Sequence, residues 1–207
     1  MVLNVNHLTL YRNQQAVISD LTFAIGECQK FVLQGEIGSG KSTLLLALLG
    51  FVPLHSGEIN WFGKSCRQEA DFMPLRGNTV GICFQQADDQ LFGPTVLDDV
   101  AFGCLNQGKN KAESYQIALV QLERLGIVHL KDRPVNLLSG GEKNFTALAG
   151  VLAMQPKMLL LDEPTNGLDA KNKAKLTALL QALELPMLIA SHDLAFSEAL
   201  ADEVICL

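Results

Sequence analysis

The chain has 207 residues, of which 48% are hydrophobic and 18% charged, and it carries a formal net charge of -6. This acidic balance argues against a broad contact surface for nucleic acid, because proteins that bind the phosphate backbone usually present a basic face. The apolar stretches at 44–52 and 158–161 are shorter than the roughly 20 residues of a membrane-spanning helix, and the first residues lack the features of a secretory signal. We therefore expect one compact cytoplasmic domain.

The N-terminal quarter has the pattern of an antiparallel sheet. Polar and apolar residues alternate over 2–10 and again over 16–25, on either side of a polar turn at 12–15. Such alternation is typical of half-buried strands. A further strand is expected at 56–63, between turn residues. The strand expected at 30–33 differs, because it is short and apolar and leads into a glycine-rich loop.

The glycine-rich loop matches the phosphate-binding pattern G-x-x-x-x-G-K-[ST]. Glycines let backbone N–H groups approach a phosphate, Lys41 supplies positive charge to the terminal phosphates, and Ser42 is placed to ligate Mg2+. A buried helix is expected at 41–50, so the loop lies between a strand and a helix, as the motif requires. The residues predicted to bind nucleotide are Gly35, Glu36, Ile37, Gly38, Ser39, Gly40, Lys41, Ser42 and Thr43.

The pattern becomes helical in the middle of the chain. After a strand expected at 79–84, apolar residues follow helical spacing from about residue 90 to 139. We predict an α-helical subdomain at about 90–139, inserted into a core made of about 1–89 and 140–207. The apolar face of one of its helices is expected to consist of Ile117, Leu119, Val120, Leu122 and Leu125.

Helices and strands alternate from residue 141 onwards. Helices are expected from 141 to about 154 and from 170 to 183, and strands at 158–161, 187–190 and 203–207. This alternation implies a parallel sheet. The predicted fold class is therefore α/β: a P-loop NTPase core with a mostly parallel sheet, an N-terminal antiparallel β subdomain and an inserted α-helical subdomain.

Two carboxylates, Asp162 and Glu163, follow the apolar strand at 158–161. The carboxyl ends of parallel strands meet at one edge of a sheet, so this pair should emerge beside the phosphate loop. We expect Asp162 to hold Mg2+ and Glu163 to act as a general base toward the attacking water. Two acids after a strand more often begin a turn or a helix, but the phosphate loop upstream favours the catalytic role.

A second anion site is predicted at Leu138-Ser139-Gly140-Gly141-Glu142, where a serine and two glycines open a helix. Free N–H groups and the positive end of the helix dipole attract an anion there. The predicted binding residues are Ser139, Gly140, Gly141 and Glu142. The same residues form a good capping box, and the two functions are compatible.

A phosphate loop followed by LSGGE and then LLLDEP resembles the nucleotide-binding domain of the ABC (ATP-binding cassette) family. The resemblance implies that the chain binds ATP with Mg2+ and hydrolyses it. It also implies that Tyr11 stacks on adenine. Two further catalytic residues are implied: Gln85, which contacts Mg2+ and the attacking water, and His192, which contacts the terminal phosphate. Local packing is the alternative for Tyr11, and Gln86 is the alternative for Gln85.

The resemblance also implies partners. In this family two domains pair head to tail, so a second ATPase subunit is expected, as a homodimer that forms on ATP. Each nucleotide would lie between the Lys41 loop of one subunit and the Ser139 segment of the other. Residues 84–92 and 95–103 further resemble the ATPases of energy-coupling-factor importers for cobalt, nickel or vitamins. That implies a transmembrane coupling protein, a substrate-binding membrane subunit and a peripheral position on the inner face of the cell membrane.

Two other functions stay open. A soluble ABC-type ATPase in DNA repair, translation or cluster assembly is disfavoured, because the chain has one set of motifs and no long insertion between residues 40 and 139. The other alternative is a regulatory subunit that binds nucleotide without hydrolysing it. The departure from the family pattern at 144–146 (Asn-Phe-Thr) favours such a regulator, whereas the presence of Glu163 and His192 argues against it.

Overall fold

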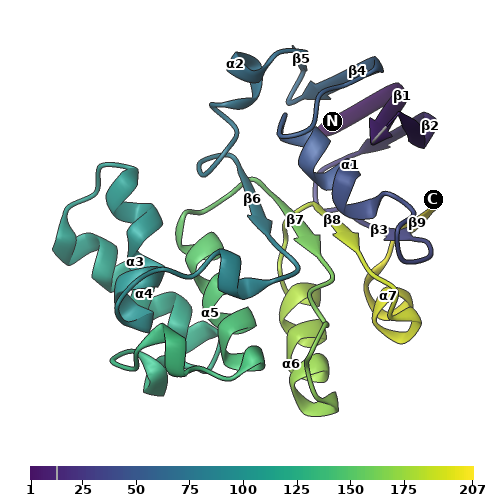
Figure 1. Ribbon diagram of the computed structural model, residues 1–207. Helices are drawn as coiled ribbons and strands as arrows, with labels where there is room; N and C mark the ends of the chain where they lie inside the picture. The colour runs from purple at the N-terminus through teal and green to yellow at the C-terminus, as the bar shows by residue number, and fades with distance from the viewer. Residues whose placement is uncertain (13) are drawn as a thin grey trace.

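The computed structural model describes residues 1–12 and 14–207 and contains two β-sheets with helices packed around them (Figure 1). Asn13, part of the turn expected at 12–15, lies outside the described residues. The strands are β1 (Leu3–Arg12), β2 (Gln15–Ile25), β3 (Lys30–Gln34), β4 (Ser56–Trp61), β5 (Lys64–Cys66), β6 (Val80–Cys83), β7 (Met158–Asp162), β8 (Met187–Ala190) and β9 (Glu203–Cys206). One sheet has the order β2-β1-β4-β5 and the other has the order β6-β7-β8-β3-β9.

The helices occupy the connections between these strands. Those of the described residues are α1 (Lys41–Leu48), α2 (Glu69–Phe72), α3 (Val96–Asn106), α4 (Lys111–Arg124), α5 (Gly140–Ala153), α6 (Ala170–Gln181) and α7 (Leu194–Leu200), with short 3-10 turns η1 (Ala87–Asp89), η2 (Val128–Leu130) and η3 (Val135–Leu137). No helix in the described part of the chain has the length and apolar character needed to cross a membrane.

The five-stranded sheet is parallel throughout, which confirms the α/β fold class. Parallel neighbours need crossover connections, and α6 supplies one between the neighbours β7 and β8, while α7 leads from β8 to β9 on the other side of β3. The central strands β7 and β8 are buried along their whole length, as expected for a sheet covered on both faces. The N-terminal strands form the predicted antiparallel sheet.

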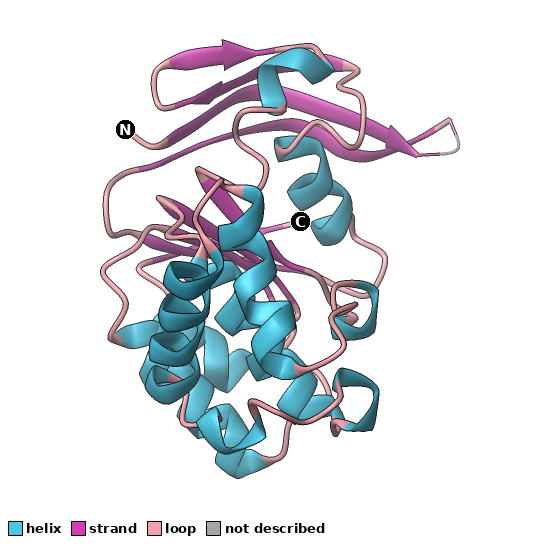
Figure 2. Cartoon of the chain, turned by 90° about the vertical axis from the view of Figure 1, so that its left-hand side faces the viewer, coloured by secondary structure: helices cyan, strands magenta, loops and turns pink. Residues whose placement is uncertain are grey.

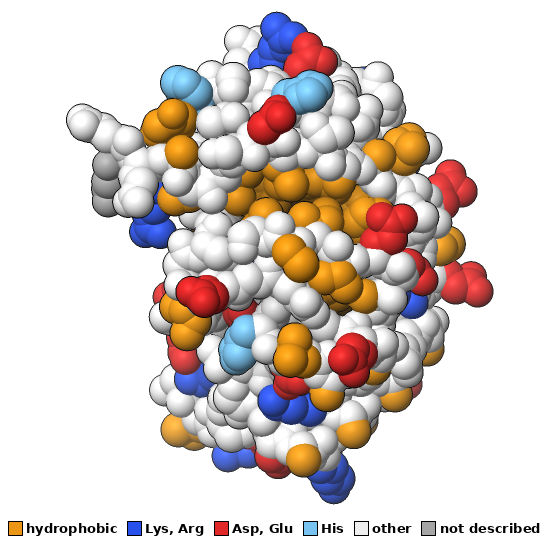
Figure 3. Space-filling model, turned by 90° about the vertical axis from the view of Figure 1, so that its right-hand side faces the viewer, with side chains coloured by type: hydrophobic (Ala, Val, Ile, Leu, Met, Phe, Trp, Pro, Cys, Tyr) orange, Lys and Arg blue, Asp and Glu red, His pale blue; other side chains and the backbone are white. Residues whose placement is uncertain are grey.

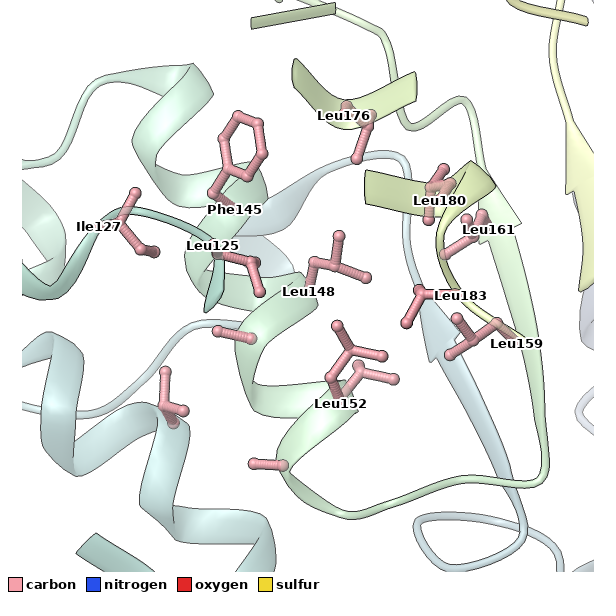
Figure 4. Packing of buried hydrophobic residues seen from close by; sticks show 14 of the residues in the cluster. Leu125, Ile127, Phe145, Leu148, Leu152, Leu159, Leu161, Leu176, Leu180 and Leu183 are labelled. Carbon is pink, nitrogen blue, oxygen red and sulfur yellow. The ribbon is translucent and has the colours of Figure 1, made fainter. Parts of the chain in front are cut away.

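Two hydrophobic cores lie on opposite faces of the parallel sheet. Successive strand residues point to opposite faces, so β7 contributes Leu159 and Leu161 to one core and Met158 and Leu160 to the other. Figure 2 shows the layers in order, with the antiparallel sheet and α1 above the parallel sheet and the other large helices below it. Figure 4 shows Leu148 and Leu152 of α5 facing the β7 leucines and α6.

The predicted apolar face of α4 is wrong at one position. Val120 is 48% exposed, whereas the buried residues of this helix are Ser114, Ala118 and Leu122, spaced four apart, with Leu125 directly after it. Helix α4 packs against α3 and α5, and two of the three buried residues of the helix are small. Ser114 and Ala118 are weakly hydrophobic, so hydrophobic periodicity does not identify them as part of the buried face.

Three short elements, β5, α2 and α7, were not predicted. They have three, four and seven residues, too few to display a hydrophobic period. Hydrophobic side chains also gather in a band across the middle of the face seen in Figure 3, between the layers of the two sheets. The site residues Lys41, Glu163 and His192 follow the predicted strands β3, β7 and β8 in the chain.

Candidate nucleotide-binding site

The phosphate loop connects β3 to α1. Gly38 and Gly40 have φ values of 91° and 102°, in the left-handed region that glycine adopts without steric cost. Gly40 is the N-cap of α1, and among the described residues no side chain caps that helix. The first N–H groups of α1 and the positive end of its dipole are therefore available to an anion.

Lys41 is buried inside this loop, with 7% of its surface exposed. Its Nζ donates to the carbonyl oxygens of Gly35, at 2.7 Å, and Glu36, at 3.0 Å. Among the described residues no carboxylate pairs with it. The loop thus holds a positive charge bound only by neutral oxygens, and a phosphate would supply the countercharge.

Asp162 lies at the end of β7 and is 8% exposed. Burial raises the pKa of its carboxyl, the neighbouring Glu163 raises it further, and the Ser42 hydroxyl and Lys41 oppose the shift. Its Oδ1 is buried without a hydrogen-bond partner among the described residues. Leaving a buried acceptor unpaired is costly, and a hard divalent cation is the ligand that a carboxylate oxygen beside a serine hydroxyl fits.

Glu163 has a different environment from its neighbour. Its Oε2 lies 2.7 Å from Nδ1 of His192, and the backbone N–H of His192 donates to the same oxygen at 3.2 Å. Its own N–H donates to the carbonyl of Ala190 at 2.8 Å. Glu163 has a φ of 48°, a left-handed conformation that costs a non-glycine residue on the order of 1–3 kcal/mol. The fold therefore maintains a strained turn that directs this carboxylate to His192.

A cleft of about 440 Å³ brings the predicted residues together from four distant segments. We call it the Lys41 cleft. Among its lining residues are Ile37, Gly38, Gly40, Lys41, Ser42, Thr43, Gln85, Glu163 and His192, all predicted from the sequence. Arg12, Val17 and Asn166 also line it and were not predicted as binding residues. Asn166 is three residues after Glu163 in the chain, which is a signal for it, but no sequence pattern identifies Arg12 or Val17.

Tyr11 lies outside the set of described residues that line the Lys41 cleft. Its ring packs against His55, with the ring centroids 4.5 Å apart and the planes at 55°. Tyr11 is 44% exposed. The predicted stacking on adenine stays a prediction, whereas the alternative, local packing, is present in the structure.

The second anion segment also lies outside the lining of the Lys41 cleft. Ser139 is the N-cap of α5, and the predicted capping box is present: the backbone N–H and Oγ of Ser139 donate to Glu142 Oε2, at 2.7 and 2.8 Å. Hydrogen bonds with Ser139 lower the pKa of the Glu142 carboxyl. Ser139 and Gly140 are exposed. In one copy of the chain, the two segments predicted to bind anions are therefore separate.

The unusual Asn-Phe-Thr stretch lies in α5, directly after the capping box. Asn144 Nδ2 donates to the carbonyl of Asn166 at 3.1 Å, and Thr146 Oγ1 donates to the carbonyl of Glu142 at 2.8 Å. Phe145 is buried, with the ammonium of Lys175 over its ring. This stretch therefore fastens α5 to the turn that follows Glu163.

The sequence and the fold match one protein family. Residues 18–166 match the family model described as ABC transporter. The chain is 66% identical to an ABC transporter ATP-binding protein of Haemophilus influenzae, with 100% of this chain and 94% of that protein covered. It is 40% identical to the cobalt import ATP-binding protein CbiO of Rhodobacter capsulatus, with 90% and 68% covered. The solved structure of CbiO1 from Clostridium perfringens, part of an ABC transporter complex, superposes with a TM-score of 0.89 at 34% identity, with 99% and 84% covered.

Proposed function

The chain belongs to the ABC transporter ATP-binding family, and from this membership we propose that it is the ATP-hydrolysing subunit of a membrane importer of the energy-coupling-factor type. The cargo class in this proposal is a transition-metal ion, cobalt or nickel, or a vitamin. The observation that carries the ATPase assignment is the Lys41 cleft, where a buried ammonium, a serine hydroxyl and the Glu163–His192 pair meet. The cargo class rests on similarity to the cobalt import ATPase of Rhodobacter capsulatus.

The proposed roles follow from the geometry. Lys41 and the N-terminus of α1 bind the phosphates, because they combine a charge held by neutral carbonyls with an uncapped helix end. Ser42, Gln85 and Asp162 hold Mg2+, which supplies positive charge to the phosphate oxygens when bound. The Asp162 oxygen without a partner supports this assignment. These groups bind and orient the nucleotide.

Glu163 and His192 are the proposed catalytic pair. Glu163 accepts a proton from the attacking water. Because the residue is only 8% exposed, bulk water has little access to its carboxylate. The Nδ1 of His192 is turned toward Glu163, so Nε2 remains for the terminal phosphate. The histidine therefore has two proposed tasks: it orients the base and it contacts the terminal phosphate that the water attacks.

A second copy of the chain completes the proposed site. Ser139, Gly140, Gly141 and Glu142 open α5 toward solvent, outside the Lys41 cleft of their own chain. In a head-to-tail dimer that closes on ATP, this segment of one subunit faces the phosphates held by Lys41 of the other. The proposal includes a helical subdomain at about 90–139, which packs on α5 through α3 and α4.

A surface hollow lined by two aromatic rings supports the proposal of a membrane partner. Phe92 and Phe102 are 63% and 42% exposed and meet edge to face, with ring centroids 4.5 Å apart. They line a hollow of about 450 Å³ together with Gln90, Asp99 and Met154, which we call the Phe92 hollow. Exposed aromatic pairs beside a concavity are typical anchors for a partner. The proposed occupant is a transmembrane coupling protein, which would hold the chain on the inner face of the membrane.

Co-purification from native membranes and phosphate release test this function together. We expect a coupling protein and a substrate-binding membrane subunit to be recovered with the chain, and ATP hydrolysis to be faster with them than with the chain alone. If no membrane protein is recovered and membrane preparations do not accelerate hydrolysis, the soluble ATPase is favoured instead. Binding of ATP without phosphate release in either preparation would favour the regulatory subunit.

A further inference from the structure

An ion pair connects helix α6 to the residue that follows His192. Lys173 Nζ lies 2.6 Å from Asp193 Oδ2. The side chains are 41% and 18% exposed, so the pair is sheltered on its aspartate side and open on its lysine side. It joins two segments that both leave the carboxyl ends of central strands, since α6 follows β7 and Asp193 follows β8.

Both carboxylate oxygens and both backbone polar groups of Asp193 make hydrogen bonds. Its second carboxylate oxygen, Oδ1, accepts the N–H of Phe196 at 3.2 Å and caps α7, while its own N–H donates to Ser191 Oγ at 3.1 Å. Its carbonyl accepts the hydroxyl of Ser197 at 2.8 Å. Lys173 lowers the pKa of this carboxyl most strongly. With both oxygens occupied, Asp193 restricts the backbone of the residue before it.

The backbone at His192 matters because both its N–H and its ring nitrogen meet the same oxygen of Glu163. A rotation of this peptide would break one hydrogen bond or both. The side chain of His192 is itself 58% exposed, so packing alone does not hold its ring. The contacts of Asp193 are therefore the restraint closest to the catalytic pair on the C-terminal side.

The backbone from Glu163 to the first turn of α6 connects Lys173 to Glu163. Lys173 lies in the first turn of α6, where its N–H donates to the carbonyl of the N-cap residue, Asp169, at 2.9 Å. The turn before this helix is closed by the N–H of Asn166, which donates to the carbonyl of Glu163 at 3.0 Å. The chain from Glu163 to Lys173, the ion pair and His192 thus form a closed ring around the catalytic contact.

We propose that Lys173 is a positioning residue for ATP hydrolysis, which acts by holding Asp193 and, through it, His192 against Glu163. This inference rests on the proposed roles of Glu163 and His192. A partly exposed ion pair contributes little to global stability, so its loss should leave the fold intact. The loss should instead loosen the contact between His192 and Glu163, where a misplacement of about 1 Å can cost up to about 100-fold in rate.

The test compares three variants of the purified full chain. Lys173→Met removes the charge and keeps much of the length, Lys173→Arg keeps the charge, and Lys171→Met removes an exposed charge of the same helix that pairs with no carboxylate among the described residues. We expect Lys173→Met to lower kcat about 10- to 100-fold with KM within twofold and an unchanged melting temperature. Lys173→Arg should recover most of the rate, and Lys171→Met should behave as wild type.

A double variant separates positioning from a general structural effect. If Lys173 acts through Glu163, adding Lys173→Met to Glu163→Gln lowers kcat no further, because residues that act as a unit are not additive. A further loss equal to that of the single variant, or a drop in melting temperature that accounts for the lost rate, overturns the inference. If Lys173→Met does not fold, Asp193→Asn, which keeps the oxygen that caps α7, serves for the same measurements.

The control for the underlying function is Glu163→Gln alone. Wild-type turnover in that variant contradicts the proposed role of Glu163 in the function on which the inference rests. Slow turnover in Glu163→Gln with wild-type turnover in Lys173→Met overturns only the role of Lys173. The two failures are therefore distinguishable in one set of kinetic measurements.

Discussion

Oε2 of Glu163 lies 2.7 Å from Nδ1 of His192 and also accepts the backbone N–H of the same residue. Asp162, its neighbour in the chain, keeps a buried oxygen without a hydrogen-bond partner among the described residues. Two adjacent carboxylates therefore differ in what surrounds them: one is oriented by a histidine, and the other is left for a cation. This difference supports separate roles for the two residues, with Glu163 as the base and Asp162 as the metal ligand.

Replacing Glu163 with Gln should lower ATP turnover about 10²- to 10⁴-fold, the usual contribution of a general base. The amide retains the shape and the acceptor oxygen but cannot take the proton. ATP should still bind, so size-exclusion chromatography with ATP and Mg2+ should show a dimer that persists. A variant that hydrolyses ATP at the wild-type rate would exclude Glu163 as the base.

Replacing Lys41 with Ala should weaken ATP binding by about 10- to 100-fold, because a hydrogen bond to a charged group contributes about 1.5–3 kcal/mol. The variant also frees the carbonyls of Gly35 and Glu36, which the ammonium binds. Equilibrium titration with a fluorescent ATP analogue measures the affinity. The matched control is Lys64→Ala, an exposed lysine on β5, which should bind as wild type; equal affinity in both variants would contradict the role of Lys41.

The capping box of α5 should make stability depend on acidic pH. Hydrogen bonds lower the pKa of Glu142 in the folded chain, so its contribution is present above the unfolded pKa, about 4.3, and is lost as pH falls through the lower folded value. At pH 7 Glu142→Ala should destabilise the chain by about 1 kcal/mol. Denaturant unfolding at pH 7 and pH 3.5 should show a smaller difference at the lower pH; an equal or larger difference there would argue against this linkage.

A substitution in the Phe92 hollow should weaken partner binding without changing the rate of ATP hydrolysis by the isolated chain. Phe92→Ala removes an exposed ring that contacts Phe102, and truncation of an anchor residue typically costs 1–2 kcal/mol or more, roughly tenfold in affinity. ATP hydrolysis by the chain alone should remain within twofold. Val204→Ala, which shortens an exposed apolar side chain on β9, is the control. Recovery of membrane partners should fall for the first variant only, and equal recovery would place the interface elsewhere.

The thiols should differ in reactivity. Cys83, on β6, is only partly buried as a residue, yet burial of its thiol raises its pKa to about 12. The thiolate is the reactive form, so Cys83 should resist a maleimide reagent at pH 8 while the exposed Cys28 and Cys206 react. Mass spectrometry of labelled peptides checks the order. Fast labelling of Cys83 in the folded chain would show that its strand end opens to solvent.

The sequence by itself determined the features that depend on neighbouring residues. The phosphate loop, the apolar strand before Asp162 and the capping box of Ser139 with Glu142 follow from local spacing, and the structure contains all of them in the predicted elements. Their order along the chain also identified the family. Such features are predictable because backbone conformation, helix capping and strand alternation depend on residues a few positions apart.

Only the tertiary structure decided which of these features meet. It brought Glu163 to His192 and Lys173 to Asp193, lined the Lys41 cleft with Arg12 and Val17, and kept the Ser139 segment outside that cleft. It also turned Val120 to solvent, while the small residues Ser114 and Ala118 lie on the buried face of α4. Contacts between distant segments depend on how whole faces pack, and hydrophobic periodicity identifies an apolar face without identifying the surface that covers it.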